Sequence, residues 1–146
     1  MTYTSIVCGV TGSAHSQKAA LEAAALAKRH NARLTYVYAV DTAFLRGSIG
    51  GMSTSIAEEG LMHLGAQMLA YAEQLAQSHG VSPKKIVRSG AVLEVLKQVL
   101  IEEKADLLVL GHEERTLFEK TLFKGNVEDH IEELKKRTGT EVTVIR

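Results

Sequence analysis

Residues 106–111 read Asp-Leu-Leu-Val-Leu-Gly, and this short apolar run followed by a glycine is the part of the chain that decides the fold. A run of four to eight apolar residues between polar or turn residues is typical of a β-strand buried on both faces. Four other stretches have a related character, although the one at 85–87 is weak. The sequence therefore predicts five strands, at 5–10, 34–40, 85–87, 106–110 and 141–145.

Helical patterns fill the intervals between these strands. The stretch at 15–30 is rich in alanine, the best helix former, and the stretch at 91–104 places its apolar residues on one helical face. Helices are expected at 15–30, 55–79, 91–104 and 126–137. The alternation βαβαβαβαβ predicts an α/β fold, with an open parallel sheet, helices on both faces and right-handed crossovers.

Residues that stop or start helices stand at the expected boundaries. Asn31 and Gly80 follow the first two helices, and both residue types accept the left-handed backbone that ends a helix. Ser55 and Glu58 have the spacing of a capping box at the start of the second helix. Ser13 is expected to cap the first helix.

Length and charge limit the classes of function. The chain has 146 residues, which suits one domain over 1–146, and its 17 basic and 17 acidic residues give a net charge of zero. A nucleic-acid-binding protein would normally show a basic excess, so that class is not expected. The single cysteine, the lack of a secretory signal pattern and the lack of a membrane-length apolar run predict a cytoplasmic protein.

Ligands of open α/β sheets bind beyond the carboxyl ends of the strands, where the strand order reverses. The predicted strands lead there into Thr11-Gly12, Val40 and Gly111. Another candidate is Gly125-Asn126-Val127, because the free N–H groups at a helix start suit a phosphate. A plain helix cap explains the same tripeptide. The expected ligand-binding residues are Thr11, Gly12, Val40, Gly111, Gly125, Asn126 and Val127.

The whole chain resembles the universal stress protein family. The similarity runs from Gly12-Ser13-x-x-Ser16 through residues 105–111 and 125–127 to Val142-Thr143-Val144-Ile145. The resemblance implies a Rossmann-like sheet of five parallel strands in the order 3-2-1-4-5, four flanking helices and a homodimer. It also implies a motif G-x2-G-x9-G-S/T after the fourth strand in ATP-binding members, and an Asp after the first strand that reads adenine.

The sequence departs from this ATP-binding pattern at several positions. Gly111 matches the first glycine, but Glu114 holds the place of the second, and Gly125 lies one residue too far along. Asn126 replaces the Ser or Thr, and Thr11 stands where the Asp would be. Glu114 removes a close backbone approach to a phosphate and adds negative charge near a polyanion. The nucleotide site is therefore expected to be degenerate.

Two functions follow as hypotheses. The first is a non-catalytic stress-response module that acts by dimerisation and by binding a ligand or an unidentified protein partner. The alternative is a sensor of adenine nucleotides or a slow ATP hydrolase, which would bind ATP or AMP with Mg²⁺. The 260/280 nm absorbance ratio of the purified, Trp-free protein would discriminate between a chain that copurifies with nucleotide and one that does not.

The remaining reactive residues have simpler interpretations. Cys8 lies inside a predicted strand and is expected to be a buried thiol rather than a nucleophile. None of the six histidines has the spacing of a zinc motif, although His112 follows Gly111 at the expected cleft. The glycine-rich connection at 41–54 is long for such a domain, and a partner site and simple disorder both explain it.

The stretch at 141–145 is expected to pair two copies of the chain. By the strand order that the resemblance implies, this strand lies at a sheet edge, and a β-branched, uncharged edge is a template for pairing. We therefore expect a homodimer through the C-terminal strand. The alternative is an edge exposed to water and protected by Glu141 and Arg146.

Overall fold

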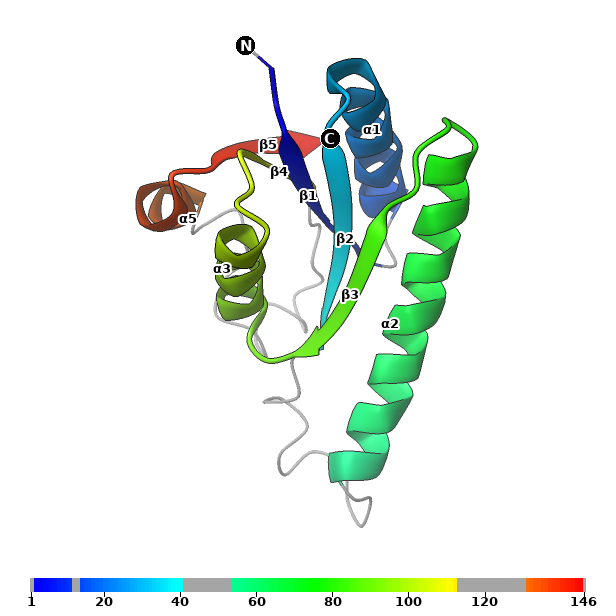
Figure 1. Ribbon diagram of the computed structural model, residues 1–146. Coiled ribbons are helices and arrows are strands. Elements are labelled where there is room, and N and C mark those ends of the chain that lie inside the picture. Colours follow the sequence, from blue (N-terminus) through cyan, green and yellow to red (C-terminus); the bar gives the residue numbers. More distant parts are fainter. Residues whose placement is uncertain (1, 12–13, 41–53, 113–130, 146) are drawn as a thin grey trace.

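A computed structural model of the chain describes residues 2–11, 14–40, 54–112 and 131–145 (Figure 1). Five parallel strands form one sheet in the order β3-β2-β1-β4-β5, which confirms the expected order. The strands are β1 (Ser5–Gly9), β2 (Arg33–Val40), β3 (Lys84–Ser89), β4 (Leu107–Gly111) and β5 (Glu141–Ile145). The described helices are α1 (Ala14–His30), α2 (Thr54–Gln77), α3 (Val92–Glu102) and α5 (Ile131–Thr138).

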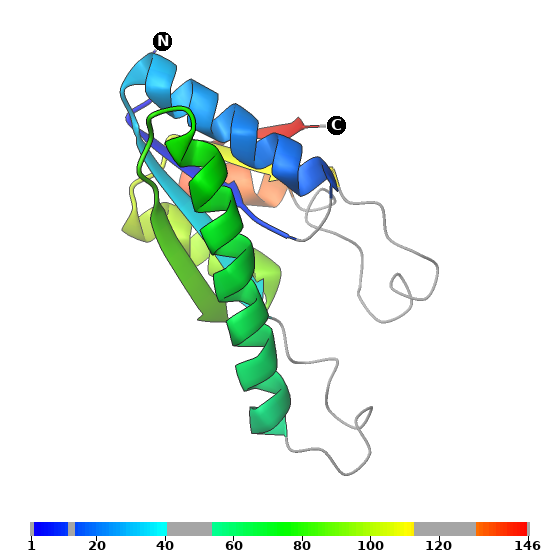
Figure 2. The same ribbon diagram turned by 90° about the vertical axis from the view of Figure 1, so that its right-hand side faces the viewer.

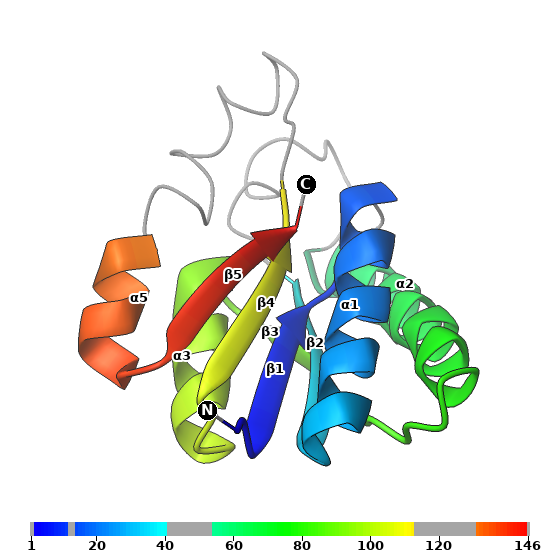
Figure 3. The ribbon, with the colours of Figure 1, turned by 90° about the horizontal axis from the view of Figure 1, so that it is seen from above.

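Helices cover both faces of the sheet. Helices α1 and α2 pack together on one face, and α3 and α5 pack on the other (Figures 2 and 3). The strands alternate accordingly, because successive side chains of a strand point to opposite faces. In β1, Ile6 and Cys8 belong to the core under α1 and α2, whereas Val7 belongs to the core under α3 and α5.

The alanines of α1 contribute to packing as well as to helix propensity. Five of them are buried against the sheet, at positions 19, 20, 23, 24 and 27. Such small side chains let the helix backbone come close to the strands beneath. At this contact the hydroxyl of the buried Tyr36 in β2 donates a hydrogen bond of 2.7 Å to the carbonyl of Ala20.

The first three helices end in the same way. Within three residues of each helix end, one residue has a positive φ: 53° at Asn31, 78° at Gly80 and 50° at Lys104. The next N–H then donates to a carbonyl five residues back, from Ala32 to Ala27, from Val81 to Ala76 and from Ala105 to Leu100. Asn31 and Gly80 thus end their helices as the sequence predicted.

Most element boundaries differ from the expectation by one or two residues, and β3, α3 and α5 show the clearest differences. Strand β3 spans Lys84–Ser89 rather than 85–87, because all six residues pair with β2 despite their polar character. Helix α3 ends at Glu102 rather than at 104, because Lys104 takes the left-handed conformation. The helix expected at 126–137 is described only from Ile131, and residues 126–130 lie outside the described residues.

Asp106 fixes the start of β4 to the chain just before β1. Its carboxylate accepts the backbone N–H of Thr4 at 2.8 Å and that of Ser5 at 3.1 Å. Burial of the Asp106 carboxyl acts to raise its pKa, but these hydrogen bonds outweigh burial and hold the pKa below its ordinary value of 3.8. The two central strands are therefore held together before their ladder begins.

Candidate functional site

A pocket of about 120 Å³ lies at the carboxyl ends of β1 and β4. The order of the sheet reverses here, since the chain runs from β1 to β2 on one side and returns to β4 on the other. This is the position at which open α/β sheets bind ligands. The pocket is lined by Gly9, Val10, Thr11, Ser16, Val37, Tyr38, Ala39, Val92, Leu96, Leu110 and Gly111.

Most of the pocket wall is apolar. Helix α3 contributes Val92 and Leu96, while Leu110 of β4 and Ala39 of β2 contribute further aliphatic groups. The volume lies below the roughly 300–1,000 Å³ usual for small-molecule sites, so the described walls enclose only part of a ligand, such as a flat base. Pockets with an apolar lining and a few polar groups are typical of small-molecule sites.

Thr11 and Ser16 form the polar corner of this pocket. The backbone N–H of Thr11 donates a hydrogen bond of 2.7 Å to the hydroxyl oxygen of Ser16, which is buried in the first turns of α1. The bond ties Thr11, just after β1, to α1, so the start of α1 is held beside the pocket. The family pattern included Ser16, but a seryl hydroxyl that binds the strand end was not foreseen.

Gly111 has a packing role that the glycine motif did not reveal. A Cβ atom on Gly111 would lie 2.6 Å from both the carbonyl carbon and the carbonyl oxygen of His15. Only glycine therefore lets the end of β4 touch the first turn of α1. This close packing is by itself a sufficient reason for a glycine at position 111, independent of any bound phosphate.

Two histidines meet beside the pocket. The rings of His15 in α1 and His112 after β4 lie edge to face, with centroids 5.6 Å apart and planes at 86°. The N–H of His112 also donates to the carbonyl of Ile145 and extends the ladder between β4 and β5. The sequence drew attention to His112 through Gly111, but it gave no sign of His15, which lies far away in the chain.

The expected binding residues are only partly brought together by the structure. Thr11 and Gly111 both line the pocket. Val40 is buried at the end of β2, where its carbonyl accepts the N–H of Gly90 at 2.8 Å, and the neighbouring Ala39 lines the pocket. Gly12, Gly125, Asn126 and Val127 lie outside the described residues, as do Glu114 and the expected cap Ser13.

The chain matches a known family model over almost its whole length. The model of the universal stress protein family matches residues 2–145. The chain belongs to the universal stress protein family. No curated protein sequence matches it.

Solved universal stress proteins share the fold of this chain at low sequence identity. The universal stress protein UspA from Lactobacillus plantarum is 22% identical, with a TM-score of 0.78 over 100% of this chain and 99% of that one. A universal stress protein in complex with cAMP is 24% identical, with a TM-score of 0.70 over 100% and 98%. A universal stress protein from Archaeoglobus fulgidus in complex with dAMP is 15% identical, with a TM-score of 0.64 over 100% of both chains.

The chemistry available in this universal stress protein's pocket is limited. No residue lining the pocket, among those that the structure describes, carries an ionisable acid or base except the phenol of Tyr38, whose pKa is raised by burial. Within residues 2–11, 14–40, 54–112 and 131–145, no three His, Cys, Asp or Glu side chains are grouped to hold a metal ion. Burial also raises the pKa of the Cys8 thiol, as expected for a core cysteine.

No helix among the described residues is both long and apolar enough to cross a lipid bilayer.

Proposed function

We propose that the chain is a non-catalytic stress-response module whose pocket at the ends of β1 and β4 binds an adenosine monophosphate. The observation that carries this proposal is the apolar slot at the reversal of the strand order, with its polar corner at Thr11 and Ser16. A flat base is an apolar body with a polar edge, and this slot offers both kinds of contact. Relatives of the same fold bind cAMP and dAMP, which supports the same ligand class.

Thr11 is proposed to contact the base. Its hydroxyl both donates and accepts hydrogen bonds, so it can take the place of the carboxylate that reads adenine in ATP-binding members. A neutral hydroxyl gives a weaker and less selective contact than a carboxylate does. We therefore expect modest affinity and limited discrimination between purines.

The phosphate is proposed to lie near the start of α1, with Gly12, Gly111, Gly125, Asn126 and Val127 around it. The amino end of a helix carries partial positive charge that favours an anion. A monophosphate is favoured over ATP because the sequence replaces the second glycine of the ATP motif with Glu114. A single phosphate also has less need of Mg²⁺ than a triphosphate does.

Binding without hydrolysis is proposed for the same pocket. General acid–base catalysis needs a titratable side chain within hydrogen-bond reach of the reacting group. Apart from the phenol of Tyr38, the described lining residues have only aliphatic side chains, hydroxyls and backbone. We propose that the bound nucleotide changes how the protein meets a partner in the cytoplasm.

Isothermal titration with cAMP and with AMP tests this function. Ala39→Leu places extra methyl groups inside the slot, whereas the matched Ala66→Leu places them on the exposed surface of α2. We expect the wild type and Ala66→Leu to bind equally, and Ala39→Leu to lose about tenfold or more in affinity, as for one blocked contact region. No binding by the wild type, or equal binding by a folded Ala39→Leu variant, would contradict the proposal.

The homodimer through β5 is a second part of the proposal. Among the described strands, β5 pairs only with β4, so its other edge is open for a second copy. The carboxylate of Glu141, at the start of this strand, accepts the hydroxyl of Tyr3 at 2.7 Å and is held beside the segment before β1. After Glu141, the strand continues with the uncharged, half-buried Val142, Thr143 and Val144.

A further inference from the structure

A second hollow, of about 560 Å³, opens at the opposite end of the sheet. It lies where β2 and β3 begin, between the ends at which α1 and α2 lead into these strands, at the top of Figure 1. The hollow is lined by Ala27, Lys28, Asn31, Ala32, Arg33, Leu34, Thr35, Gly80, Val81, Ser82, Lys84 and Glu103. The proposed nucleotide pocket shares none of these residues.

Three cationic side chains from three different elements line this hollow. Lys28 comes from the last turn of α1, Arg33 from the start of β2 and Lys84 from the start of β3. The ammonium of Lys28 reaches across to the turn after α2, where it lies 3.5 Å from the point that a Cβ on Gly80 would occupy. The convergence of these elements, which are distant in the sequence, concentrates positive charge in one concave place.

One carboxylate in the lining, that of Glu103, offsets part of this charge. It accepts hydrogen bonds from Lys84 Nζ at 3.0 Å and from Thr35 Oγ1 at 3.2 Å. Three cations and one anion leave two positive charges on the walls, in a chain whose net charge is zero. Among the described residues, Lys28 has no ion-pair partner.

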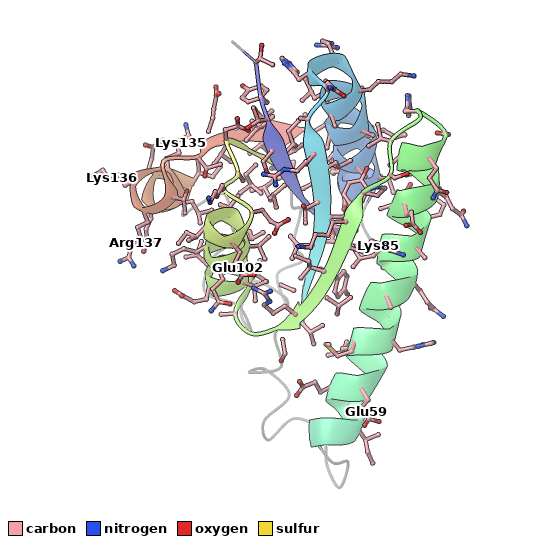
Figure 4. The ribbon with its side chains drawn as sticks, viewed as in Figure 1. Glu59, Lys85, Glu102, Lys135, Lys136 and Arg137 are labelled. Carbon is pink, nitrogen blue, oxygen red and sulfur yellow. The ribbon has the colours of Figure 1, made fainter. Side chains whose placement is uncertain are left out.

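The other two cations of β3, Lys85 and Arg88, are both paired with carboxylates outside the hollow. Lys85 pairs with Glu73 of α2 at 3.0 Å, and Arg88 pairs with Glu102 of α3 at 2.7 Å. Figure 4 labels Lys85 and Glu102. Both cations are neutralised by partners on the helices that flank the strand. The unbalanced charge is therefore not a general feature of β3.

Two of the three cations also lie at helix ends, an arrangement that binds one nitrogen of Arg33 but leaves the ammonium of Lys28 facing the hollow. Basic residues in the last turn of a helix, such as Lys28, complement the partial negative charge of the last carbonyls. Here, backbone N–H groups already bind the carbonyls of Ala27 in α1 and Ala76 in α2. Arg33 Nη2 donates to the carbonyl of Glu103 at the end of α3 at 3.2 Å, whereas Lys84 belongs to a strand and binds the Glu103 carboxylate.

We propose that this hollow binds a small phosphorylated molecule through Lys28, Arg33 and Lys84. A phosphate group presents several charged acceptor oxygens in different directions, so cations from several elements can donate to it at once. Asn31 and Ser82 in the same lining supply neutral hydrogen-bond partners. The volume lies within the range of about 300–1,000 Å³ that is usual for small-molecule sites.

Titration of the uniformly ¹⁵N-labelled full chain with pyrophosphate, followed by backbone amide NMR, tests the proposal. We expect the shifts to concentrate at Asn31, Arg33, Gly80 and Ser82. Lys28→Gln should lower the affinity about tenfold, the contribution of one charge-assisted hydrogen bond. The matched control Lys18→Gln removes the same charge from an exposed site on α1 outside the hollow and should leave the affinity unchanged.

A second variant changes the affinity in the opposite direction. Glu103→Gln removes the carboxylate that occupies Lys84, so pyrophosphate should bind about fivefold more tightly. Glutarate, which carries two carboxylates, should bind more weakly than pyrophosphate. Equal affinities of the wild type and Lys28→Gln, or shifts confined to Thr11 and Gly111, would overturn the proposal and leave the nucleotide proposal intact.

Discussion

Gly111 and Gly60 differ in the space around them, and this difference gives a matched test of the contact between β4 and α1. A Cβ on Gly111 would meet the backbone of His15 at 2.6 Å, whereas a Cβ on Gly60 in α2 would meet nothing within 4 Å. We expect Gly111→Ala to lower the free energy of unfolding by about 1–3 kcal/mol, the usual effect of overpacking. Gly60→Ala should raise it by about 0.5–1 kcal/mol, because alanine restricts the unfolded chain more than glycine does.

Urea unfolding followed by circular dichroism measures both variants. An unchanged stability of Gly111→Ala would mean that the end of β4 does not touch α1 as described.

Asp106 predicts a defined dependence of stability on pH. Its pKa is lowered in the folded chain, because the hydrogen bonds from Thr4 and Ser5 outweigh burial. A lowered folded pKa adds stability above the unfolded value, and this stability disappears as the pH falls through the folded pKa. We expect the wild type to be more stable than Asp106→Asn at pH 7, and the difference to shrink below the ordinary pKa of 3.8. A difference in urea midpoints that stays constant down to pH 3 would disagree with this account.

At the level of residues, the sequence predicted whether a side chain is buried better than it predicted which side chains touch. Cys8 was expected in the core and is fully buried there. The ring contact between His15 and His112 and the hydrogen bond from Thr11 to Ser16 were not foreseen. The ring contact depends on how the first turn of α1 meets the end of β4, and no periodic pattern in the sequence encodes that meeting.

At the level of elements, α3 ends less favourably than α1 and α2. All three helices end at a residue with positive φ, but α3 uses Lys104 where α2 uses Gly80 and α1 uses Asn31. A side chain with a Cβ adopts this conformation at a cost, and glycine does not. We expect Lys104→Gly to raise the free energy of unfolding by about 0.5–1 kcal/mol, after the greater freedom of glycine in the unfolded chain is subtracted.

Asn31→Gly is the matched comparison for Lys104→Gly. Asparagine tolerates the left-handed conformation, so this change should alter the thermal midpoint very little. A decrease in the midpoint of Lys104→Gly would show that Lys104 stabilises the end of α3 in a way that its backbone does not reveal.

The predicted element bounds were wrong where polar residues belong to a strand. They were also wrong where a residue other than glycine or asparagine ends a helix. Strand β3 is twice as long as the three residues expected, since Lys84, Arg88 and Ser89 join β2 through their backbones. Their side chains gave no apolar signal, so only the pairing with β2 defines the strand. Lys104 gave no sign of a helix end, because lysine is usually a helix former.

At the level of the whole molecule, the alternation of strands and helices was sufficient to predict the layers. The strand order came from the family resemblance and is confirmed. The pocket between the ends of β1 and β4 also lies where the topology rule places a ligand, but its walls were not predicted. Leu96 lines it because α3 packs against β2 and β1, and Ala39 lines it from the carboxyl end of β2, so both depend on tertiary packing.

Two proline substitutions at neighbouring positions of β5, Val144→Pro and Thr143→Pro, test the proposed dimer. The N–H of Glu141 donates to Asp106, and the carbonyl of Ile145 accepts from His112, so alternate residues 141, 143 and 145 face β4. The backbone of Val144 therefore faces the open edge. We expect the wild type to have twice the chain mass of 15.9 kDa by light scattering, and a folded Val144→Pro variant to have this mass once.

Thr143→Pro is the control variant, because it removes an N–H that points to β4 rather than to the open edge. Its N–H faces β4, so this variant should lose stability within the sheet rather than lose only the dimer. A wild-type mass of one chain, or a dimer that persists in Val144→Pro, would contradict pairing through this edge.

The most direct test of the central claim is an amide NMR titration of the ¹⁵N-labelled protein with cAMP. The claim is that the carboxyl ends of β1 and β4 hold an adenosine monophosphate. We predict saturable shifts at Thr11, Ser16, Ala39 and Gly111, all of which line the pocket, and no shifts at Asn31 or Ser82 at the opposite end of the sheet. An absence of saturable shifts at the pocket, or shifts only at the opposite end, would contradict the account.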